Sequence, residues 1–125
     1  MIMIIGGAYQ GKHTFAKELY PDIIWADGKS CSEKELKTAQ GVVGFHHYIE
    51  RMIRAGESAE HLAKELTKEN PELIIVTDEI GYGIVPIDKV EREYRETTGR
   101  VCTELAAFSE KVYRVTCGIG QLIKR

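Results

Sequence analysis

The sequence predicts a three-layer α/β fold, in which helices flank a mostly parallel sheet. Short apolar runs alternate along the chain with segments of helical periodicity, which is the pattern of repeated strand and helix units. The run LIIV at 73–76 is continuously apolar, as expected for a strand that is covered on both faces. A chain of 125 residues is of the size of one domain, so we expect a single domain over residues 1–125.

The first unit is an apolar strand at Ile2–Ile5, a glycine loop, and a helix over Lys12–Leu19 that stops near Pro21. The loop reads GGAYQGKHT and comprises Gly6, Gly7, Ala8, Tyr9, Gln10, Gly11, Lys12, His13 and Thr14. Its Gly-x4-Gly-Lys spacing fits the Walker A pattern, in which backbone N–H groups cradle phosphates and the lysine reaches the β and γ phosphates. This predicts a P-loop NTPase-like fold that binds a nucleotide. The alternative is a glycine-rich turn with an incidental lysine.

His13 departs from the Walker A pattern, because a serine or threonine hydroxyl normally meets Mg²⁺ at this position. Magnesium is a hard cation that prefers oxygen ligands, so an imidazole is a poor replacement. Thr14 points about 100° further around the helix and does not simply take over the role. We therefore expect metal binding here to be weakened, water-mediated or absent.

A second strand is predicted in PDIIWADG, which leaves Asp27 at its carboxyl end. Asp27 is a candidate second carboxylate for Mg²⁺, with turn formation as the alternative. Ser32 and Glu35 form a capping-box signature for a helix that begins near Glu33.

Two further helices are predicted over Val42–Arg54 and Ala59–Lys68. In the break between them, Gly56 suits a C-terminal cap and Ser58 an N-cap. The first of these helices carries the pair His46 and His47. Adjacent helical positions face about 100° apart and rarely share one metal, so we interpret both histidines as helix-surface or partly buried residues.

The stretch LIIVTDE resembles a Walker B strand, which delivers Asp78 and Glu79 to the edge of the sheet where open α/β proteins bind ligands. One carboxylate would hold Mg²⁺ through water and the other would act as a base. The alternative is that either residue caps the following turn. We take Lys12, Asp78 and Glu79 as candidate catalytic residues, and Asp78 and Asp27 as candidate Mg²⁺ ligands.

A long helix is predicted over Ile87–Glu110, followed by a strand, a turn and a short terminal strand. The helix carries Arg92, Arg95 and Arg100, which either present a cation to phosphates or form ion pairs on a solvated face.

Composition excludes some partners. The net charge of −2 gives no general attraction to nucleic acid, and the apolar run MIMII is too short for a membrane span. Three widely spaced cysteines signal neither a disulfide framework nor a zinc site, so we expect a reducing cytoplasm.

Four stretches together resemble the bifunctional adenosylcobinamide kinase and adenosylcobinamide-phosphate guanylyltransferase family of cobalamin biosynthesis. They are GGAYQGK, VTDEIGYGIVP, REYRETTGRVCTELAAFSEKVYRV and CGIGQLIK. The resemblance implies a transferase that uses GTP or ATP, with Mg²⁺ as a candidate cofactor, and a corrinoid substrate, adenosylcobinamide. Members phosphorylate the aminopropanol hydroxyl and then transfer GMP through a guanylyl-histidine. A homotrimer is implied as well.

The resemblance places the nucleotide at Gly6, Gly7, Gly11 and Lys12. It also places Glu79, Gly81, Gly83 and Pro86 on the family's active-site loop, and Arg95, Gly99 and Arg100 on its recurrent helical pattern.

This chain departs from the family in its middle. Typical members are longer between the first helix and the ELIIV strand, and their nucleotide-accepting histidine lies in the segment that is absent here. Asp78, Cys102 and His13 replace two asparagines and the magnesium hydroxyl. The favoured hypothesis is therefore a kinase-like transferase without guanylyl transfer. The alternatives are a catalytically inactive nucleotide-binding paralogue with a regulatory role, and a small P-loop kinase or NTPase for another substrate.

Overall fold

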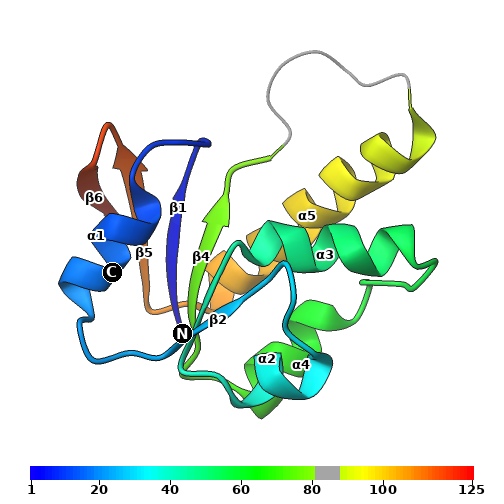
Figure 1. The fold of residues 1–125 in the computed structure, drawn as a ribbon, viewed down its shortest axis with the longest axis horizontal. Coiled ribbons are helices and arrows are strands. Elements are labelled where there is room, and N and C mark those ends of the chain that lie inside the picture. The colour runs from blue at the N-terminus through cyan, green and yellow to red at the C-terminus, as the bar shows by residue number, and fades with distance from the viewer. Residues whose placement is uncertain (81–87) are drawn as a thin grey trace.

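The computed structural model describes residues 1–80 and 88–125, and its strands form one six-stranded sheet (Figure 1). The strands are β1 (Ile2–Gly6), β2 (Trp25–Asp27), β3 (Gly41–Val43), β4 (Ile74–Asp78), β5 (Lys111–Thr116) and β6 (Ile119–Lys124). Their order across the sheet is β2-β3-β4-β1-β5-β6, and all neighbours are parallel except β5 and β6. The predicted α/β class with a mostly parallel sheet is confirmed.

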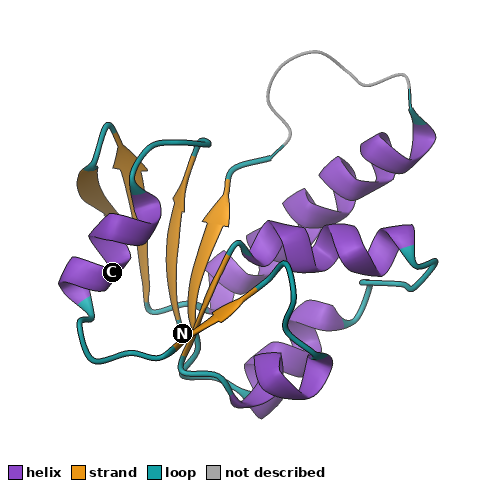
Figure 2. Ribbon diagram, viewed as in Figure 1, coloured by secondary structure: helices purple, strands orange, loops and turns teal. Residues whose placement is uncertain are grey.

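The helices are divided unequally between the two faces of the sheet. On one face, α1 (Lys12–Leu19) packs against β1, β4 and β6. The core of the other face includes buried residues of α2 (Glu33–Thr38), α3 (Phe45–Arg54), α4 (Leu62–Glu69) and α5 (Lys89–Phe108). In Figure 2, α1 lies to the left of β1 and β4, and the other described helices lie mainly to the right. The fold therefore has three layers and is P-loop NTPase-like, as predicted.

Each central strand contributes side chains to both cores. Met3 and Ile75 lie in the larger core beneath α2 to α5, whereas Ile4 and Val76 lie in the smaller core beneath α1. Successive side chains of a strand point to opposite faces of the sheet, so a strand covered on both faces must be apolar at every position. This requirement explains the continuous apolar runs in the sequence.

Two predicted caps are confirmed. The Ser32 hydroxyl accepts a hydrogen bond from the Glu35 N–H at 3.0 Å, and the Glu35 carboxylate accepts one from the Ser32 N–H at 3.4 Å. This pair is the capping box of α2. Gly56 follows α3 with a φ of +77°, a left-handed conformation that costs a glycine little, and so ends the helix as predicted.

The prediction of one helix over Val42–Arg54 is wrong at its start. Val42 belongs to β3, which pairs with both β2 and β4, and the helix α3 begins only at Phe45. Gly44, with a φ of +65°, makes the turn between strand and helix. The apolar run GVV fits the period of either element, and a position in the middle of the sheet decides in favour of the strand.

The boundaries of two other helices also differ from the prediction. Ser58 is not an N-cap, because its hydroxyl accepts from the Glu60 N–H in a turn and α4 starts at Leu62. The long helix α5 starts at Lys89, where the Asp88 carboxylate accepts from the Val90 N–H at 2.8 Å. Its predicted start at Ile87 lies outside the described residues.

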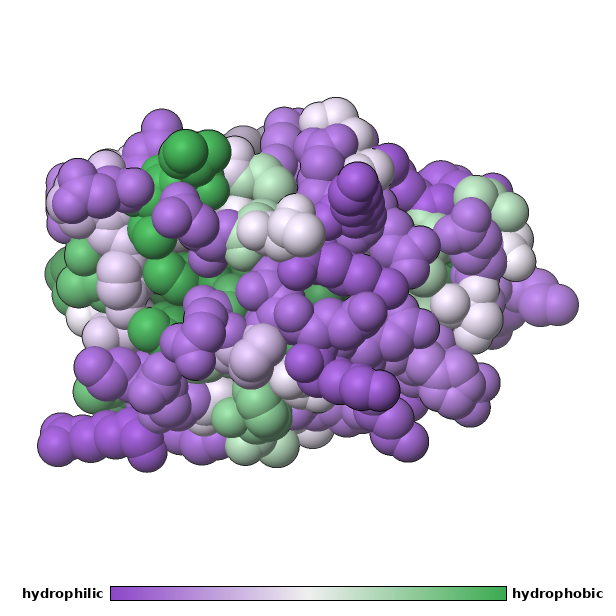
Figure 3. Space-filling view, turned by 90° about the horizontal axis from the view of Figure 1, so that it is seen from below, coloured by the Kyte–Doolittle hydropathy of each residue, from purple (hydrophilic) through white to green (hydrophobic). Residues whose placement is uncertain are grey.

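The surface is mainly hydrophilic when seen from below, and hydrophobic residues gather on the side of α1 and β6 (Figure 3). Large apolar side chains exposed on α1 and β6 are Leu19, Ile119 and Ile123. Among the described helices, none combines the length and the apolar character needed to cross a membrane.

Candidate functional site

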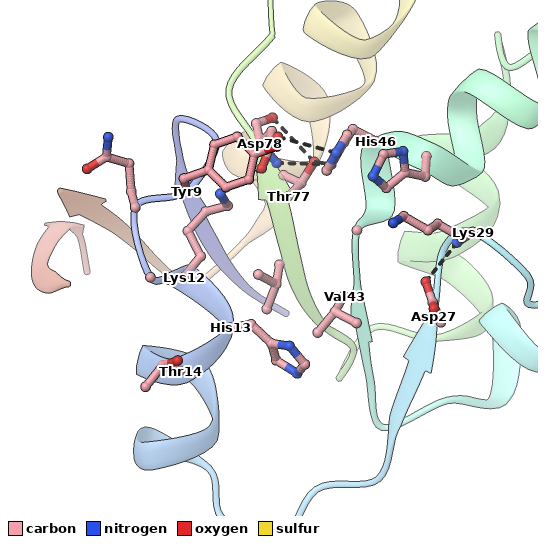
Figure 4. Close-up of a pocket in the computed structure, with 15 residues that line it drawn as sticks. Tyr9, Lys12, His13, Thr14, Asp27, Lys29, Val43, His46, Thr77 and Asp78 are labelled. Atoms are coloured by element: carbon pink, nitrogen blue, oxygen red, sulfur yellow. Dashed lines mark hydrogen bonds and ion pairs between the residues drawn. The ribbon is translucent and has the colours of Figure 1, made fainter. Parts of the chain in front are cut away.

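A pocket of about 400 Å³ opens at the carboxyl edge of the parallel strands (Figure 4). Its lining comes from the loop after β1, the turn after β2, the junction of β3 with α3, and the end of β4. The lining residues are Tyr9, Gln10, Gly11, Lys12, His13, Thr14, Asp27, Lys29, Val43, Gly44, His46, His47, Val76, Thr77 and Asp78. Ligands of open α/β sheets bind at this edge, so the pocket is the candidate site.

Two glycines of the loop, Gly6 and Gly11, are required by its backbone. A Cβ at Gly6 would lie 2.5 Å from the carbonyl oxygen of Val115, so β1 ends against β5 too closely for a side chain. Gly11 has a φ of +83° and is the N-cap of α1, which has no side-chain cap. The first N–H groups of α1 therefore have no side-chain acceptor at the N-cap, which is the arrangement that suits an anion.

The loop is also held by the turn of the β5–β6 hairpin. The Gln10 side chain accepts a hydrogen bond from the Cys117 N–H at 2.7 Å, and the Gln10 carbonyl accepts one from the Gly118 N–H at 2.8 Å. Cys117 and Gly118 both have positive φ, of 51° and 76°, which is the geometry of a type I′ hairpin turn. The far end of the chain thus fixes the loop that follows the first strand.

Lys12 lies at the centre of the site. Its ammonium group donates to the Gly7 carbonyl at 2.7 Å and forms an ion pair with Asp78 Oδ1 at 2.6 Å. The pair arises from strand register, because Gly6 at the end of β1 lies opposite Asp78 at the end of β4. Lys12 is 8% exposed, so its charge is compensated almost entirely within the protein.

His46 is a site residue that the sequence reading missed. It is buried at the start of α3, and its Nδ1 accepts a hydrogen bond from the Asp78 N–H at 3.1 Å. Its Nε2 lies 3.4 Å from Asp78 Oδ2. The prediction lacked the strand β3. Because Gly41–Val43 is a strand parallel to β4, the residues that follow it lie at the carboxyl edge of the sheet, where Asp78 lies.

Burial lowers the pKa of His46 to about 4, with His47 and Lys12 acting in the same direction and Asp78 opposing them. The ring is therefore neutral at pH 7. Because Nδ1 accepts a hydrogen bond, the single proton lies on Nε2, which faces the Asp78 carboxylate.

His13 and Thr14 both line the pocket, but they point to different sides of α1 (Figure 4). The His13 ring makes an edge contact with Trp25, with ring centroids 6.2 Å apart and planes at 80°. Partial burial, helped by Lys17 and opposed by Asp27, lowers the pKa of His13 and so favours the neutral imidazole.

The comparisons with known proteins identify the family. The family model described as "Cobinamide kinase / cobinamide phosphate guanyltransferase" matches residues 41–123. The chain belongs to this family. The cobinamide kinase/guanyltransferase match includes β3, α3, β4, α5 and the β5–β6 hairpin, and hence His46 and Asp78, whereas the glycine loop and Lys12 precede it.

Two curated relatives are similar to part of the chain. They are the bifunctional adenosylcobalamin biosynthesis proteins CobU of Salmonella typhimurium and Escherichia coli, and both are 44% identical over 52 residues. The alignment covers 42% of this chain but 29% of either relative, so the chain matches under a third of the length of these members of the cobinamide kinase/guanyltransferase family.

Not all residues assigned from the resemblance to this family meet at the pocket. Glu79 accepts a hydrogen bond from Arg114 at 2.7 Å and lines a separate cavity of about 230 Å³ beside α5. Arg95 pairs with Glu91 at 3.1 Å, and Arg100 lines a third cavity near Glu57. Gly81, Gly83 and Pro86 lie outside the described residues.

Asp27 takes part in a turn. Its carboxylate accepts a hydrogen bond from the Lys29 N–H at 2.9 Å, as the turn-forming alternative predicts, and the residue also lines the pocket. Across the described part of the chain, no three metal-binding side chains of the His, Cys, Asp and Glu types converge on one point.

Proposed function

We propose that the chain binds GTP or ATP in the loop Gly6–Thr14 and transfers its terminal phosphoryl group to the hydroxyl of a corrinoid, adenosylcobinamide. The observation that carries this proposal is the placement of Lys12. It lies at an uncapped helix N-terminus and at the carboxyl edge of the sheet, beside a carboxylate. Phosphoryl transfer requires a cation, backbone hydrogen-bond donors and a carboxylate, which position the phosphates and stabilise their charge. Family membership supports the choice of substrate.

In the proposed reaction, Lys12 exchanges its contact with Asp78 for one with the β and γ phosphates. The uncapped N–H groups of α1 bind phosphate oxygens, and the hairpin turn keeps Gln10 and Gly11 in place while they do so. Asp78, released from Lys12, then faces the phosphoryl group that is transferred. The bond from the γ phosphorus to the β–γ bridging oxygen breaks as the bond to the corrinoid oxygen forms, GDP or ADP leaves, and the hydroxyl proton passes to solvent. Each part acts by position and charge, so no covalent intermediate with the protein is required.

Asp78 is the residue that best fits a magnesium ion. Mg²⁺ is commonly held by one or two carboxylates together with substrate phosphates and several waters, so a prearranged protein cage is not needed. When bound, the ion would neutralise charge on the phosphates. His13 offers nitrogen where the ion prefers oxygen, and this favours a weak or water-mediated site.

Guanylyl transfer is not part of the proposed function. A histidine that accepts a nucleotide needs a ring nitrogen with a free lone pair directed at the phosphate. In His46, Nδ1 accepts from the Asp78 backbone and Nε2 carries the proton beside a carboxylate. We expect no GMP adduct on His46 or His47 after incubation with GTP, measured by intact-protein and peptide mass spectrometry. A mass increase of one GMP on either residue would contradict this part of the proposal.

The kinase proposal is tested by incubating the protein with adenosylcobinamide, Mg²⁺ and either GTP or ATP, and by separating the corrinoids chromatographically. A phosphorylated corrinoid is expected with the wild type and not with Lys12→Ala. Equal product with both proteins, or none with either, would reject the proposed transfer.

The second candidate is a nucleotide-binding protein without catalysis. The Lys12–Asp78 ion pair and the imidazole at position 13 favour it, because both oppose the usual assembly of nucleotide and Mg²⁺. Tight GTP binding that is indifferent to Mg²⁺, without product from the corrinoid, would select this reading. Hydrolysis of nucleotide, or phosphorylation of a different alcohol, would select a P-loop kinase or NTPase for another substrate.

For each candidate function we propose that the protein is cytoplasmic. We also propose that it forms a homotrimer, and light scattering would test this oligomeric state.

A further inference from the structure

We infer that His46 is a positioning residue for the proposed phosphoryl transfer, which fixes the plane of the Asp78 carboxylate so that Asp78 keeps its orientation toward the transferred phosphoryl group after Lys12 turns to the phosphates. The inference rests on the proposed function and adds a role for a residue that nothing else assigns. Three side chains from α1, α3 and the end of β4 form a continuous series of contacts, Lys12 to Asp78 to His46 (Figure 4).

The Asp78 carboxylate needs such a partner. An aspartate χ2 torsion is broad and roughly two-fold, so a single contact at one oxygen leaves the plane of the carboxylate poorly defined. The side chain is 21% exposed and lies at the end of a strand, where packing alone restrains it little. Lys12 contacts Oδ1, and the Nε2–H of His46 faces Oδ2, so two donors from different helices define the plane.

The His46 ring is itself firmly held. It is buried against β4, and its Nδ1 accepts the Asp78 N–H at 3.1 Å and lies 3.5 Å from the Thr77 hydroxyl. The His47 ring lies beside it, with centroids 4.0 Å apart. His46 therefore accepts a hydrogen bond from the Asp78 backbone N–H and directs its own Nε2–H toward the Asp78 carboxylate.

These two contacts separate a positioning role from a merely structural one. In His46→Asn, the side-chain amide oxygen lies near the position that Nδ1 occupies in the wild type. This variant keeps the acceptor for the Asp78 N–H but loses the Nε2–H that faces the carboxylate. The amide of His46→Gln extends to the place of Nε2 and keeps that donor. His61→Gln is the matched control, since His61 is exposed at the start of α4.

The kinetic test compares kcat and KM for GTP in these variants. Loss of a residue that orients a metal-binding side chain, as His46 would orient Asp78, commonly costs about 10- to 100-fold in metal affinity or activity. We expect His46→Asn to lower kcat by that factor while KM for GTP stays within about threefold, and His46→Gln to recover most of the loss. Equal impairment of both variants, with unchanged melting temperatures, would overturn the positioning role.

A second test needs neither nucleotide nor activity. In ¹⁵N-labelled wild type without ligand, NMR of the imidazole nitrogens should show His46 with a protonated Nε2 and a bare, hydrogen-bonded Nδ1. The signal is assigned by its loss in His46→Asn. A proton on Nδ1, or a charged ring at pH 7, would overturn the inference.

If the wild type shows this tautomer but neither binds nucleotide nor phosphorylates corrinoid, the proposed function fails. In that case the Asp78 carboxyl ¹³C shift decides the positioning role, because it should move in His46→Asn and stay near the wild-type value in His46→Gln. Equal shifts in the two variants would reject the role.

Discussion

The ammonium of Lys12 lies 2.6 Å from Asp78 Oδ1, so the cation of the glycine loop is compensated before any nucleotide enters the pocket. The two residues stand 66 positions apart and meet because Gly6 and Asp78 end neighbouring parallel strands. A phosphate that binds to Lys12 must displace this carboxylate or share the lysine with it. In the proposed function, the affinity for nucleotide would therefore depend on the exchange of one anion for another.

Asp78→Asn should increase the affinity for GTP in the absence of Mg²⁺. The substitution removes the competing anion and its repulsion of the phosphates, an effect of about 1 kcal/mol, or roughly fivefold in Kd, for a partly exposed pair. Calorimetric titration with EDTA present measures it, and Asp22→Asn, an exposed position away from the pocket, is the matched control. An unchanged or weaker affinity in Asp78→Asn would show that the ion pair does not limit binding.

His13→Thr should make nucleotide binding depend on magnesium. It supplies the oxygen ligand that the Walker A pattern uses at this position. We expect Mg²⁺ to change the Kd for GTP by less than about twofold in the wild type and to strengthen binding by about tenfold in the variant. Titrations with and without Mg²⁺ measure both values. The interpretation of His13 is wrong if the wild type already shows the full Mg²⁺ effect.

Two glycine substitutions should change stability in opposite directions. A Cβ at Gly6 would meet the Val115 carbonyl at 2.5 Å, so Gly6→Ala must displace backbone at the centre of the sheet and should cost more than about 2 kcal/mol. Gly99 lies inside α5 with open space around it, so Gly99→Ala should add about 0.5–1 kcal/mol through helix propensity. Urea unfolding provides both values. Similar stability of the two variants would contradict the packing of β1 against β5.

The three free cysteines should differ widely in reactivity. Cys117 is exposed at the hairpin turn, whereas burial raises the pKa of Cys102 to about 12 and also raises the pKa of Cys31. A thiol whose pKa is raised this far is almost entirely protonated at pH 8, and thiolate is the reactive form. Iodoacetamide followed by peptide mass spectrometry should modify Cys117 first. Early modification of Cys102 in the native protein would contradict the raised pKa of its thiol.

Local patterns predicted the parts of the fold that carry local signals. The Walker A spacing, the Ser32 capping box and the continuous LIIV run each have a short-range physical cause, and each lies where the sequence places it. The strand Gly41–Val43 has no such signal, because three residues do not establish a period and their conformation depends on pairing with β2 and β4.

The error at β3 explains why His46 was missed. With Val42–Arg54 taken as one helix, His46 lies in the second turn of a surface element. With the strand in place, it starts α3 at the edge of the sheet beside Asp78. The contact of Gln10 with the Cys117–Gly118 turn is equally invisible in the sequence, because it joins residues 107 positions apart. The sequence alone therefore predicted the glycine loop and Asp78 as candidate site residues but not the groups that hold them.

In the proposed function, Lys12 and the loop Gly6–Thr14 bind the phosphates of a nucleotide. Isothermal titration of GTP and ATP into wild type and Lys12→Ala, with melting temperatures recorded for both, tests it most directly. We predict that the wild type binds at least one of the two nucleotides and that Lys12→Ala loses about tenfold or more in affinity, since it removes a charge-assisted contact of roughly 1.5–3 kcal/mol. Equal affinity of two folded proteins, or no binding of either nucleotide by the wild type, would contradict the claim.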